Sequence, residues 1–292
     1  MNTLPLLHKI KFQKSNKENL VDLYNEATED YEFWSKGFNM HFGYYIPFKT
    51  TFLKRDTMLN EMNNQVFNRL QLKNKKGLIA DLGCGIGGTM KYGLRKYPRL
   101  TILGVTLSPF QVSEGNKRLQ NTNGLILEDN YCNTSFADNS FDNAYAIESF
   151  CHSGHNDPTL QEAYRILKPR ARLIIADAFL KKDEEQLCNV SNYCYHQLCK
   201  SWSLEGLGTI STVKKSLERI GFKNVIVEDI SFRVVPSVLH VPFVITGFIF
   251  KKLFKKEQLK LQSWKNLKGS LFALLSGLHM KSFGYYIITA EK

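Results

Sequence analysis

The sequence predicts an α/β domain in which helices cover both faces of a mainly parallel sheet. From Leu78 onwards, short apolar runs alternate with longer amphipathic segments, which is the pattern of repeated strand–helix–strand units. A glycine-dense turn joins the first of these runs to a helix-like segment. The chain has 292 residues, enough for one large α/β domain with additions.

Seven apolar runs are expected to form strands, and amphipathic segments between and before them are expected to form helices. The strands are predicted at 78–82, 101–105, 125–128, 142–147, 171–177, 224–230 and 284–290. The predicted helices include 16–35, 55–72, 87–97, 110–121 and 158–167. Ligands of such sheets bind outside the carboxyl ends of the strands, so the site is expected at that edge.

The most informative stretch is the turn after the first predicted strand, Leu78-Ile-Ala-Asp-Leu-Gly-Cys-Gly-Ile-Gly-Gly88. Glycines in such a turn let backbone N–H groups approach a ligand closely. The spacing from Gly83 to Gly88 also fits a dinucleotide fingerprint, which needs a carboxylate at the end of the next strand. The next strand, within 100–109, has no acid, so NAD is disfavoured.

Three motifs in this order resemble those of the class I S-adenosylmethionine-dependent methyltransferases: 81–88, 104–111 and 138–148. Within that class, the chain is most similar to the branch of sterol C-methyltransferases, tocopherol methyltransferases and cyclopropane-fatty-acid synthases. The resemblance covers about residues 20–230 and the last strand. It implies S-adenosyl-L-methionine as cofactor and a Rossmann-like seven-stranded methyltransferase fold. We divide the chain into an N-terminal helical and aromatic cap, the cofactor-binding core, an inserted amphipathic helical segment and the final core strand: 1–72, 73–230, 231–283 and 284–292. The insert departs from the family pattern, in which a short hairpin joins the sixth and seventh strands.

The resemblance assigns the methionine portion of the cofactor to the first motif. Gly83, Gly85 and Gly87 would admit it, and Asp81 would orient its ammonium group. A structural role for Asp81, in which its carboxylate caps the turn, is the competing interpretation.

The next two strand ends would hold the ribose and adenine. Thr106 and Gln111 match the residues that contact these groups in the tocopherol and cyclopropane-synthase branch. The adenine amine would meet Asn130, which stands where relatives carry an Asp, or the preceding Asp129; either side chain can accept a hydrogen bond.

The fourth strand is followed by Glu148-Ser-Phe-Cys-His152, which resembles a Glu-Ala-x-Cys-His motif of sterol C-methyltransferases. In that interpretation Glu148 offsets a positive charge on the substrate or accepts the departing proton. His152 can accept a proton near neutral pH, or it is a loop histidine bonded to backbone.

An aromatic segment before the core would form the other wall of the pocket. Ring faces attract a passing cation, although aromatic residues this dense are also typical of plain core. His41 matches a histidine of a related His-x-Gly-Tyr motif, and closing the cofactor site is its alternative role. The candidate substrate-pocket residues are Tyr31, Trp34, Phe38, His41, Tyr44 and Tyr45.

Composition limits the other possibilities. The hydrophobic content of 43% and charged content of 23% are ordinary for a globular protein. Six cysteines form no disulfide framework, and Cys188, Cys194, His196 and Cys199 fit no common zinc spacing, so reduced thiols, a cytoplasmic protein and no metal are expected. No run reaches the ~18–20 apolar residues of a membrane span.

The net charge of +12 is concentrated near the C-terminus. Residues 231–292 hold ten Lys or Arg and two acids, which contributes +8. Within them, 241–256 joins an apolar run to Lys251-Lys-Leu-Phe-Lys-Lys256, as in a helix that lies on a membrane surface. A lid packed on its own domain and a protein-binding surface are the alternatives. No nucleic acid is expected, because no reading motif accompanies the lysines.

Three functions remain open. The first is methylation of a lipophilic metabolite at carbon, with an isoprenoid or sterol-like substrate. The second is O- or N-methylation of a small secondary metabolite. The third is a binding protein that keeps the nucleotide fold without turnover, which an intact glycine turn disfavours.

Overall fold

The computed structural model describes residues 35–292 except 36, 52–53, 244–245 and 248–260; for 261–266 and 277–278 it describes the backbone only. Within this part of the chain, one seven-stranded sheet has the order β3-β2-β1-β4-β5-β7-β6. All strands run parallel except β7, which is antiparallel to both of its neighbours. The strands are β1 Lys76–Leu82, β2 Arg99–Thr106, β3 Gly124–Glu128, β4 Phe141–Ile147, β5 Leu167–Leu180, β6 Lys223–Asp229 and β7 Phe283–Glu291.

Each of the seven predicted strands is present, with ends that extend at most a few residues past the prediction. The largest difference is β5, which begins at Leu167, directly where the preceding helix ends. The α-helices are α2 Arg55–Arg69, α3 Gly88–Lys96, α4 Pro109–Arg118, α5 Asp157–Ile166, α6 Asn189–Trp202, α7 Ile210–Ile220, α8 Ser231–Val238 and α10 Leu261–Leu278. Short 3-10 helices lie at Lys73–Lys75, Phe150–Ser153 and Glu184–Gln186. The helix expected at 16–35 lies outside the described residues.

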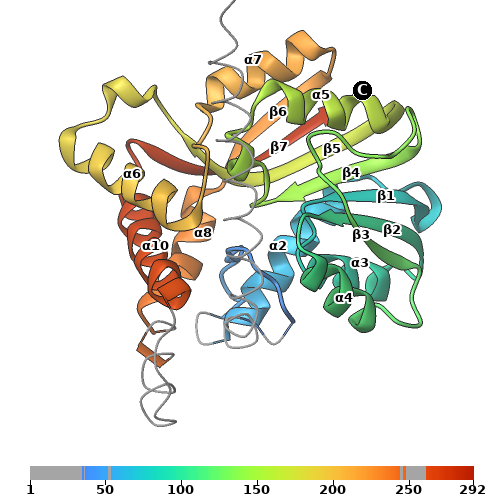
Figure 1. Ribbon diagram of the computed structural model, residues 1–292, viewed down its shortest axis with the longest axis horizontal. Helices are drawn as coiled ribbons and strands as arrows, with labels where there is room; N and C mark the ends of the chain where they lie inside the picture. The colour runs from blue at the N-terminus through green and yellow to red at the C-terminus, as the bar shows by residue number, and fades with distance from the viewer. Residues whose placement is uncertain (1–34, 36, 52–53, 244–245, 248–260) are drawn as a thin grey trace, which may run out of the picture.

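Helices cover both faces of the sheet (Figure 1). One face carries α2, α3 and α4, and its core joins Val66 and Phe67 of α2 to Ile79 of β1. The other face carries α5 and α7, where Leu160 and Leu217 pack on the strands. Adjacent residues of each strand therefore point into different cores, which explains why the strands read as continuous apolar runs.

Side-chain caps fix where two of the helices begin. Ser108 precedes α4, and its Oγ accepts a hydrogen bond from Gln111 N at 3.2 Å, with Pro109 at the first helical position. Asn156 caps α5 in the same way through Thr159 N. The cap at Ser108 holds the start of α4 close to the carboxyl end of β2.

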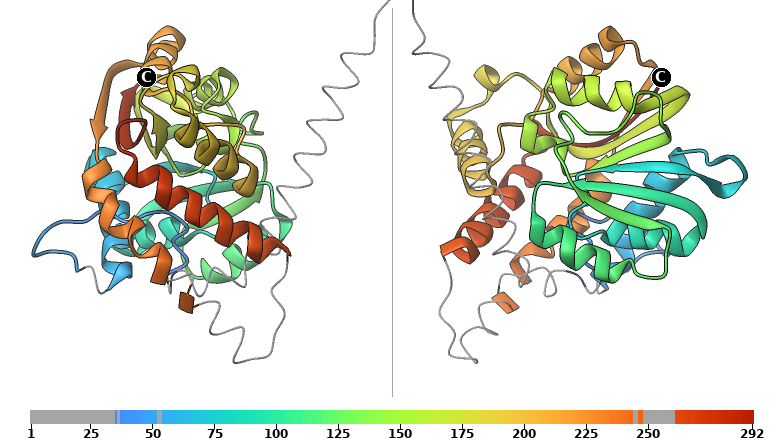
Figure 2. Two further views of the ribbon diagram at one scale, coloured as in Figure 1. Left: turned by 90° about the vertical axis from the view of Figure 1, so that its left-hand side faces the viewer. Right: turned by 45° about the vertical axis from the view of Figure 1, so that its right-hand side comes forward.

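The connection between β6 and β7 is the part that departs most from a simple hairpin. It contains α8 and α10, and α10 lies alongside α6 at the carboxyl edge of the sheet (Figures 1 and 2). The expected helical insertion before the last strand is confirmed. Its amphipathic stretch at 241–256 falls mostly outside the described residues.

Candidate active site

A cavity of about 340 Å³ opens at the carboxyl ends of β1, β2, β4 and β5 and the start of β7. We call the wall formed by the β1, β2 and β4 ends, with the segment 38–42, the cofactor side. The wall formed by α6, the 204–207 loop, α8 and α10 is the helical side. The two walls meet where Glu148, His152 and Asp177 line the same cavity.

The glycine turn brings bare backbone to the cofactor side. Gly83 has φ +102, and a Cβ there would lie 2.3 Å from the Cβ of Ser149. Gly85 has φ +54, and a Cβ there would meet no atom within 4 Å. The turn therefore tolerates no side chain at Gly83, and at Gly85 it leaves open space beside the backbone.

The sequence predicts that Gly87 contacts the cofactor, but in the structure Gly88 lies at the cavity and Gly87 does not. Gly87 adopts φ +80 before α3, and its N–H donates to the Cys84 carbonyl at 3.0 Å. A Cβ on Gly87 would face Leu119 and Ile126, and Gly87 does not line the cavity. Gly88 does line it, at a position where a Cβ would meet the Phe38 carbonyl at 2.4 Å.

Asp81 places a buried carboxyl at the end of β1. The residue is 3% exposed and lines the cavity, and its Oδ2 has no hydrogen-bond partner among the described residues. Burial raises its pKa to about 7, and the Tyr145 hydroxyl opposes this shift. An unsatisfied buried acceptor beside a bare glycine turn fits the ammonium group of a bound methionine moiety.

Thr106 and Gln111 lie together at the end of β2. The Thr106 hydroxyl donates to Gln111 Oε1 at 2.5 Å, and both side chains are buried and line the cavity. This pairing orients the Gln111 amide from the first turn of α4. The position suits contacts to a sugar or a base.

Asp129 and Asn130 follow β3, but neither lines the cavity. The Asp129 carboxylate accepts from the N–H groups of Asn130 and Ser135, at 2.7 and 2.8 Å. Asn130 Oδ1 accepts from Cys132 N at 3.0 Å. These side chains organise the loop, and the neighbouring Tyr131 lines the cavity instead.

Glu148 stands at the junction of the two walls, with a left-handed backbone at φ +48. Its Oε1 accepts from Phe42 N at 2.6 Å and from the Tyr285 hydroxyl at 2.8 Å. Burial raises its pKa to about 8; those two hydrogen bonds oppose the shift, Asp177 adds to it and Arg55 opposes it. The carboxyl therefore favours its protonated form at neutral pH.

His152 and Asp177 complete the junction. Burial lowers the pKa of His152, while the nearby Asp177 acts in the opposite direction. Asp177 is 1% exposed, and its carboxylate accepts from Cys151 N at 3.0 Å and Ala178 N at 2.8 Å. The lowered pKa keeps the His152 imidazole neutral and able to accept a proton.

Sequence reasoning missed Asp177 and its partner His155. The His155 Nε2 lies 3.2 Å from Asp177 Oδ2, its Nδ1 accepts from Gly208 N, and its ring stacks on Phe179 at 4.2 Å. Asp177 lies on β5 near its carboxyl end, and that position was the available signal. His155 carried none, because its partners come from distant segments.

The aromatic segment contributes only part of what the sequence predicts. Phe38 and His41 line the cavity, and the Arg118 guanidinium lies over the Phe38 ring at 3.5 Å from its centre. Tyr44 and Tyr45 do not line it. Tyr31 and Trp34 lie outside the described residues.

His41 is held inside the protein near the cofactor side. Burial lowers its pKa to about 4, so the ring is neutral. Its Nδ1 donates to the Phe42 carbonyl at 2.9 Å, and its Nε2 lies 3.0 Å from the side-chain amide of Asn63. The ring thus ties the segment before Phe42 to α2.

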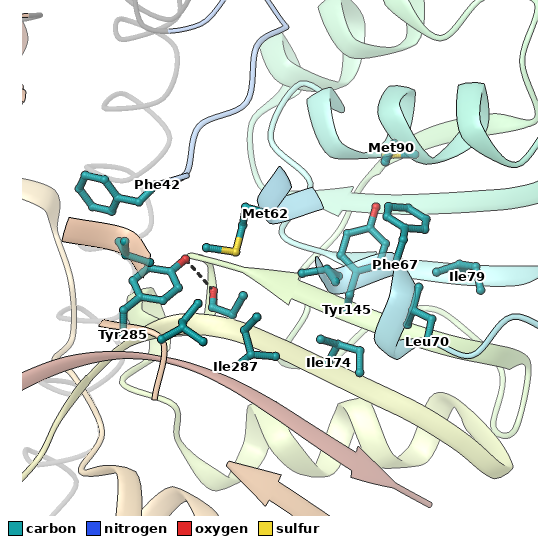
Figure 3. Close-up of a cluster of buried hydrophobic side chains, with 14 of the residues drawn as sticks. Phe42, Met62, Phe67, Leu70, Ile79, Met90, Tyr145, Ile174, Tyr285 and Ile287 are labelled. Atoms are coloured by element: carbon teal, nitrogen blue, oxygen red, sulfur yellow. Dashed lines mark hydrogen bonds between the residues drawn. The ribbon is translucent and has the colours of Figure 1, made fainter. Parts of the chain in front are cut away.

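The helical side is mainly apolar, and no sequence motif predicted which residues form it. Figure 3 shows the hydrophobic core on the α2 face of the sheet, with Phe42 and Tyr285 at one end and Phe67 and Tyr145 at the other. Phe42 and Tyr285 also line the cavity. The apolar residues of this wall are Leu198, Trp202, Leu204, Leu207, Val234, Val235, Val238, Ala273 and Phe283. Such a wall suits the body of a lipophilic molecule.

In the described part of the chain, no three His, Cys, Asp or Glu side chains gather closely enough to hold a metal ion. None of the described helices combines the length and apolarity needed to cross a membrane. Cys84 and Cys151 line the cavity, and burial raises the pKa of both thiols.

Comparison with known proteins agrees with this geometry. Residues 80–175 match a family model described as a methyltransferase domain. The 24-methylenesterol C-methyltransferase 2 of Arabidopsis thaliana is 29% identical over 219 residues, which cover 71% of this chain and 57% of that protein. The chain thus spans a little over half the length of this relative.

Solved structures share the fold at low sequence identity. A mycolic acid cyclopropane synthase in complex with SAH superposes with a TM-score of 0.80, at 16% identity over 94% of this chain and 98% of that chain. A geranyl diphosphate C-methyltransferase from Streptomyces coelicolor A3(2), solved with Mg²⁺, geranyl diphosphate and S-adenosyl-L-homocysteine, gives 0.70, with 15% identity over 94% and 97%. The seven-stranded methyltransferase fold expected from the motifs is confirmed. The chain therefore contains a methyltransferase domain, which is similar in sequence to sterol C-methyltransferases and in fold to a cyclopropane synthase.

Proposed function

We propose that this protein transfers a methyl group from S-adenosyl-L-methionine to a carbon atom of a lipophilic, isoprenoid or sterol-like substrate. The observation that carries the proposal is the junction of the cavity. There the buried Glu148 carboxyl and the neutral His152 imidazole lie between a glycine-turn cofactor side and an apolar helical side. The sterol C-methyltransferase relative supports the same substrate class.

The cofactor side supplies the groups that hold S-adenosylmethionine. Asp81 would accept from its ammonium group, the Gly83–Gly85 backbone would lie against its methionine portion, and Thr106 with Gln111 would contact its ribose and adenine. When bound, the cofactor supplies an electrophilic methyl group on a positively charged sulfur. Asp129 and Asn130 would act indirectly, by shaping the loop that carries Tyr131.

The remaining chemistry belongs to the substrate and the junction. The electron pair of a substrate double bond forms the new carbon–carbon bond, and the pair of the broken carbon–sulfur bond stays on the sulfur. The substrate is left with a cationic carbon. A neighbouring C–H pair then forms the product double bond, and its proton leaves for a base of the protein.

Glu148 and His152 are the residues placed to accept that proton. A cation in the cavity lowers the pKa of Glu148, because opposite charge favours the ionised carboxyl. The ionised carboxylate then offsets the cationic carbon at the junction of the two walls. His152 is a second acceptor, and Asp177 stabilises its protonated form.

Purified protein and methyl-labelled cofactor, offered to prenyl, sterol and quinone lipids, test the proposal. We expect label in the lipid fraction, and mass fragmentation of the product should place the added methyl on carbon. Label found only on amines or polar acids would defeat it. A methyl found on oxygen would instead favour the alternative in which His152 deprotonates a hydroxyl.

We also propose that the protein contacts membranes peripherally through 241–256. Most of this segment lies outside the described residues. Its described surroundings support the proposal, because α8, α10 and the chain next to them expose large apolar side chains: Phe232, Leu239, Phe243, Leu271 and Leu275.

Vesicle binding tests this contact. We expect the protein to sediment with anionic vesicles and to lose most of this binding when Lys251, Lys252, Lys255 and Lys256 are all changed to Gln. The control changes Lys214 and Lys215 of α7 to Gln, on the opposite face of the sheet. Equal loss in both variants would show that general charge, not this segment, drives binding.

A further inference from the structure

The charged side chains that line the cavity are all acidic in the described part of the chain. They are Asp81, Glu148 and Asp177, and no Lys or Arg lines the cavity there. The two lining histidines, His41 and His152, are kept neutral by burial. Arg55 is near enough to lower the pKa of Glu148, but it does not line the cavity. An anionic head group would therefore lie beside acidic side chains with no basic lining side chain to pair with in the described part of the chain, which is unfavourable inside a protein.

The carboxyls also have little capacity to recruit a metal that would bridge to a phosphate. Both oxygens of Asp177 accept backbone hydrogen bonds, and Glu148 Oε1 already accepts two. Asp81 lies at the glycine turn, on the cofactor side. These contacts oppose a head group that is held through a divalent cation.

The helical side carries one polar group that no described residue satisfies. Ser270, Ala273 and Ser276 follow one another at three-residue spacing on α10, and all three line the cavity. Ser276 is 4% exposed, and its hydroxyl has no hydrogen-bond partner among the described residues. A helical serine commonly bonds back to the carbonyl four residues earlier, so an unpaired one on a cavity wall is available to a ligand.

We propose that the substrate is an uncharged lipid with one hydroxyl or carbonyl oxygen, which hydrogen-bonds to the hydroxyl of Ser276. This inference rests on the proposed function and specifies its substrate class. The apolar body of the lipid packs against residues such as Leu198, Trp202 and Val234. The geranyl diphosphate C-methyltransferase shares the fold but acts on an anionic substrate, so the two sites differ in the head group they accept.

Binding of matched lipids to the full-length protein, loaded with S-adenosylhomocysteine, tests this assignment. The probes are a C15 prenyl alcohol, its parent hydrocarbon and its diphosphate, the last with and without Mg²⁺, together with a 3-hydroxysterol and its deoxy hydrocarbon. We expect at least one alcohol to bind about tenfold more tightly than its hydrocarbon, as one added hydrogen bond implies. The diphosphate should bind at least about tenfold more weakly than the alcohol under both conditions.

Ser276→Ala should reduce the alcohol affinity to that of the hydrocarbon and leave hydrocarbon affinity unchanged. Ser282→Ala is the matched control, because Ser282 is buried and unpaired among the described residues but does not line the cavity. An alcohol preference that survives Ser276→Ala, tightest binding of the diphosphate, or binding of none of the probes would overturn the assignment.

These outcomes are distinct from failure of the proposed function. Methyl transfer to carbon of the prenyl diphosphate would overturn the substrate assignment and leave C-methylation standing. Methyl transfer to polar amines or acids alone would defeat C-methylation itself. Transfer to carbon of a lipid alcohol, lost selectively in Ser276→Ala at limiting substrate, supports both.

Discussion

The cofactor side and the helical side of the cavity are built on different principles. The cofactor side uses backbone and polar side chains that follow strand ends directly in sequence, such as the Asp81–Gly85 turn. The helical side uses apolar side chains from α6, α8 and α10, which are separated by up to about eighty residues. The first can hold one invariant molecule by geometry, whereas the second can be changed to suit another lipid without disturbing the first.

The strongest test of this division is Glu148→Gln. The amide keeps the size of the side chain but cannot become a carboxylate, so it neither offsets a cationic carbon nor accepts a proton. We expect kcat to fall about 10³-fold, within the range measured for removal of a general base. The dissociation constant for S-adenosylhomocysteine, measured by calorimetry, should change by no more than about threefold, because that product lacks the sulfonium charge.

A matched variant guards against a general loss of structure. Glu128→Gln changes a carboxyl at the end of β3 that does not line the cavity, and it should retain kcat. If Glu148→Gln retains kcat as well, the proton acceptor is elsewhere and the junction has a different role.

Asp81→Asn should affect binding rather than turnover. The buried carboxyl is expected to accept from the ammonium group that S-adenosylmethionine and S-adenosylhomocysteine share. Loss of a charged hydrogen bond corresponds to about 10- to 100-fold weaker binding of both compounds. Saturating cofactor should restore kcat to near the wild-type value. Weaker binding of the sulfonium compound alone would indicate that Asp81 faces the sulfur instead.

The same contrast explains which parts of the protein the sequence predicts. Apolar runs defined all seven strands, and the turn residues around Gly83 and Gly85 reached the cavity as expected, because their roles depend on neighbours in sequence. Tyr44 and Asn130 lie in predicted stretches but point elsewhere, because side-chain direction depends on local packing. The role of Ser276 could not be predicted from the sequence, because it depends on which described residues surround its hydroxyl in the folded protein.

The stability of the ligand-free protein should depend on pH through the cofactor side and the junction. The folded pKa values of Asp81 and Glu148 are raised to about 7 and about 8, above the ordinary 3.8 and 4.5. Below about pH 4 both states carry these protons and the full stability is present. As pH rises towards 8 the unfolded chain ionises first, so stability is lost, on the order of a few kcal/mol.

Urea denaturation of wild type and Glu148→Gln at pH 5 and pH 8 measures this loss. The variant should lose less stability than the wild type between the two pH values. Ser276→Ala changes an uncharged side chain on the helical side and should show the wild-type difference. A variant that loses as much stability as the wild type would show that Glu148 is ionised in the folded protein throughout this range.

Tyr285→Phe should give the smallest effect, and it tests where the two sides meet. Tyr285 lies on β7, directly after the helical insertion, and its hydroxyl donates to Glu148 Oε1 at 2.8 Å and to the Ala176 carbonyl at 3.3 Å. Because the bond to Glu148 lowers the pKa of that carboxyl, its loss should move the rising limb of the pH–kcat profile to higher pH. At pH 7.5 we expect kcat to fall about fivefold, and at pH 9 we expect it to recover. A purely structural role for the hydroxyl would lower kcat equally at both pH values, whereas a recovered kcat would show that a hydroxyl on β7, the strand that follows the helical insertion, lowers the pKa of the junction carboxyl of Glu148.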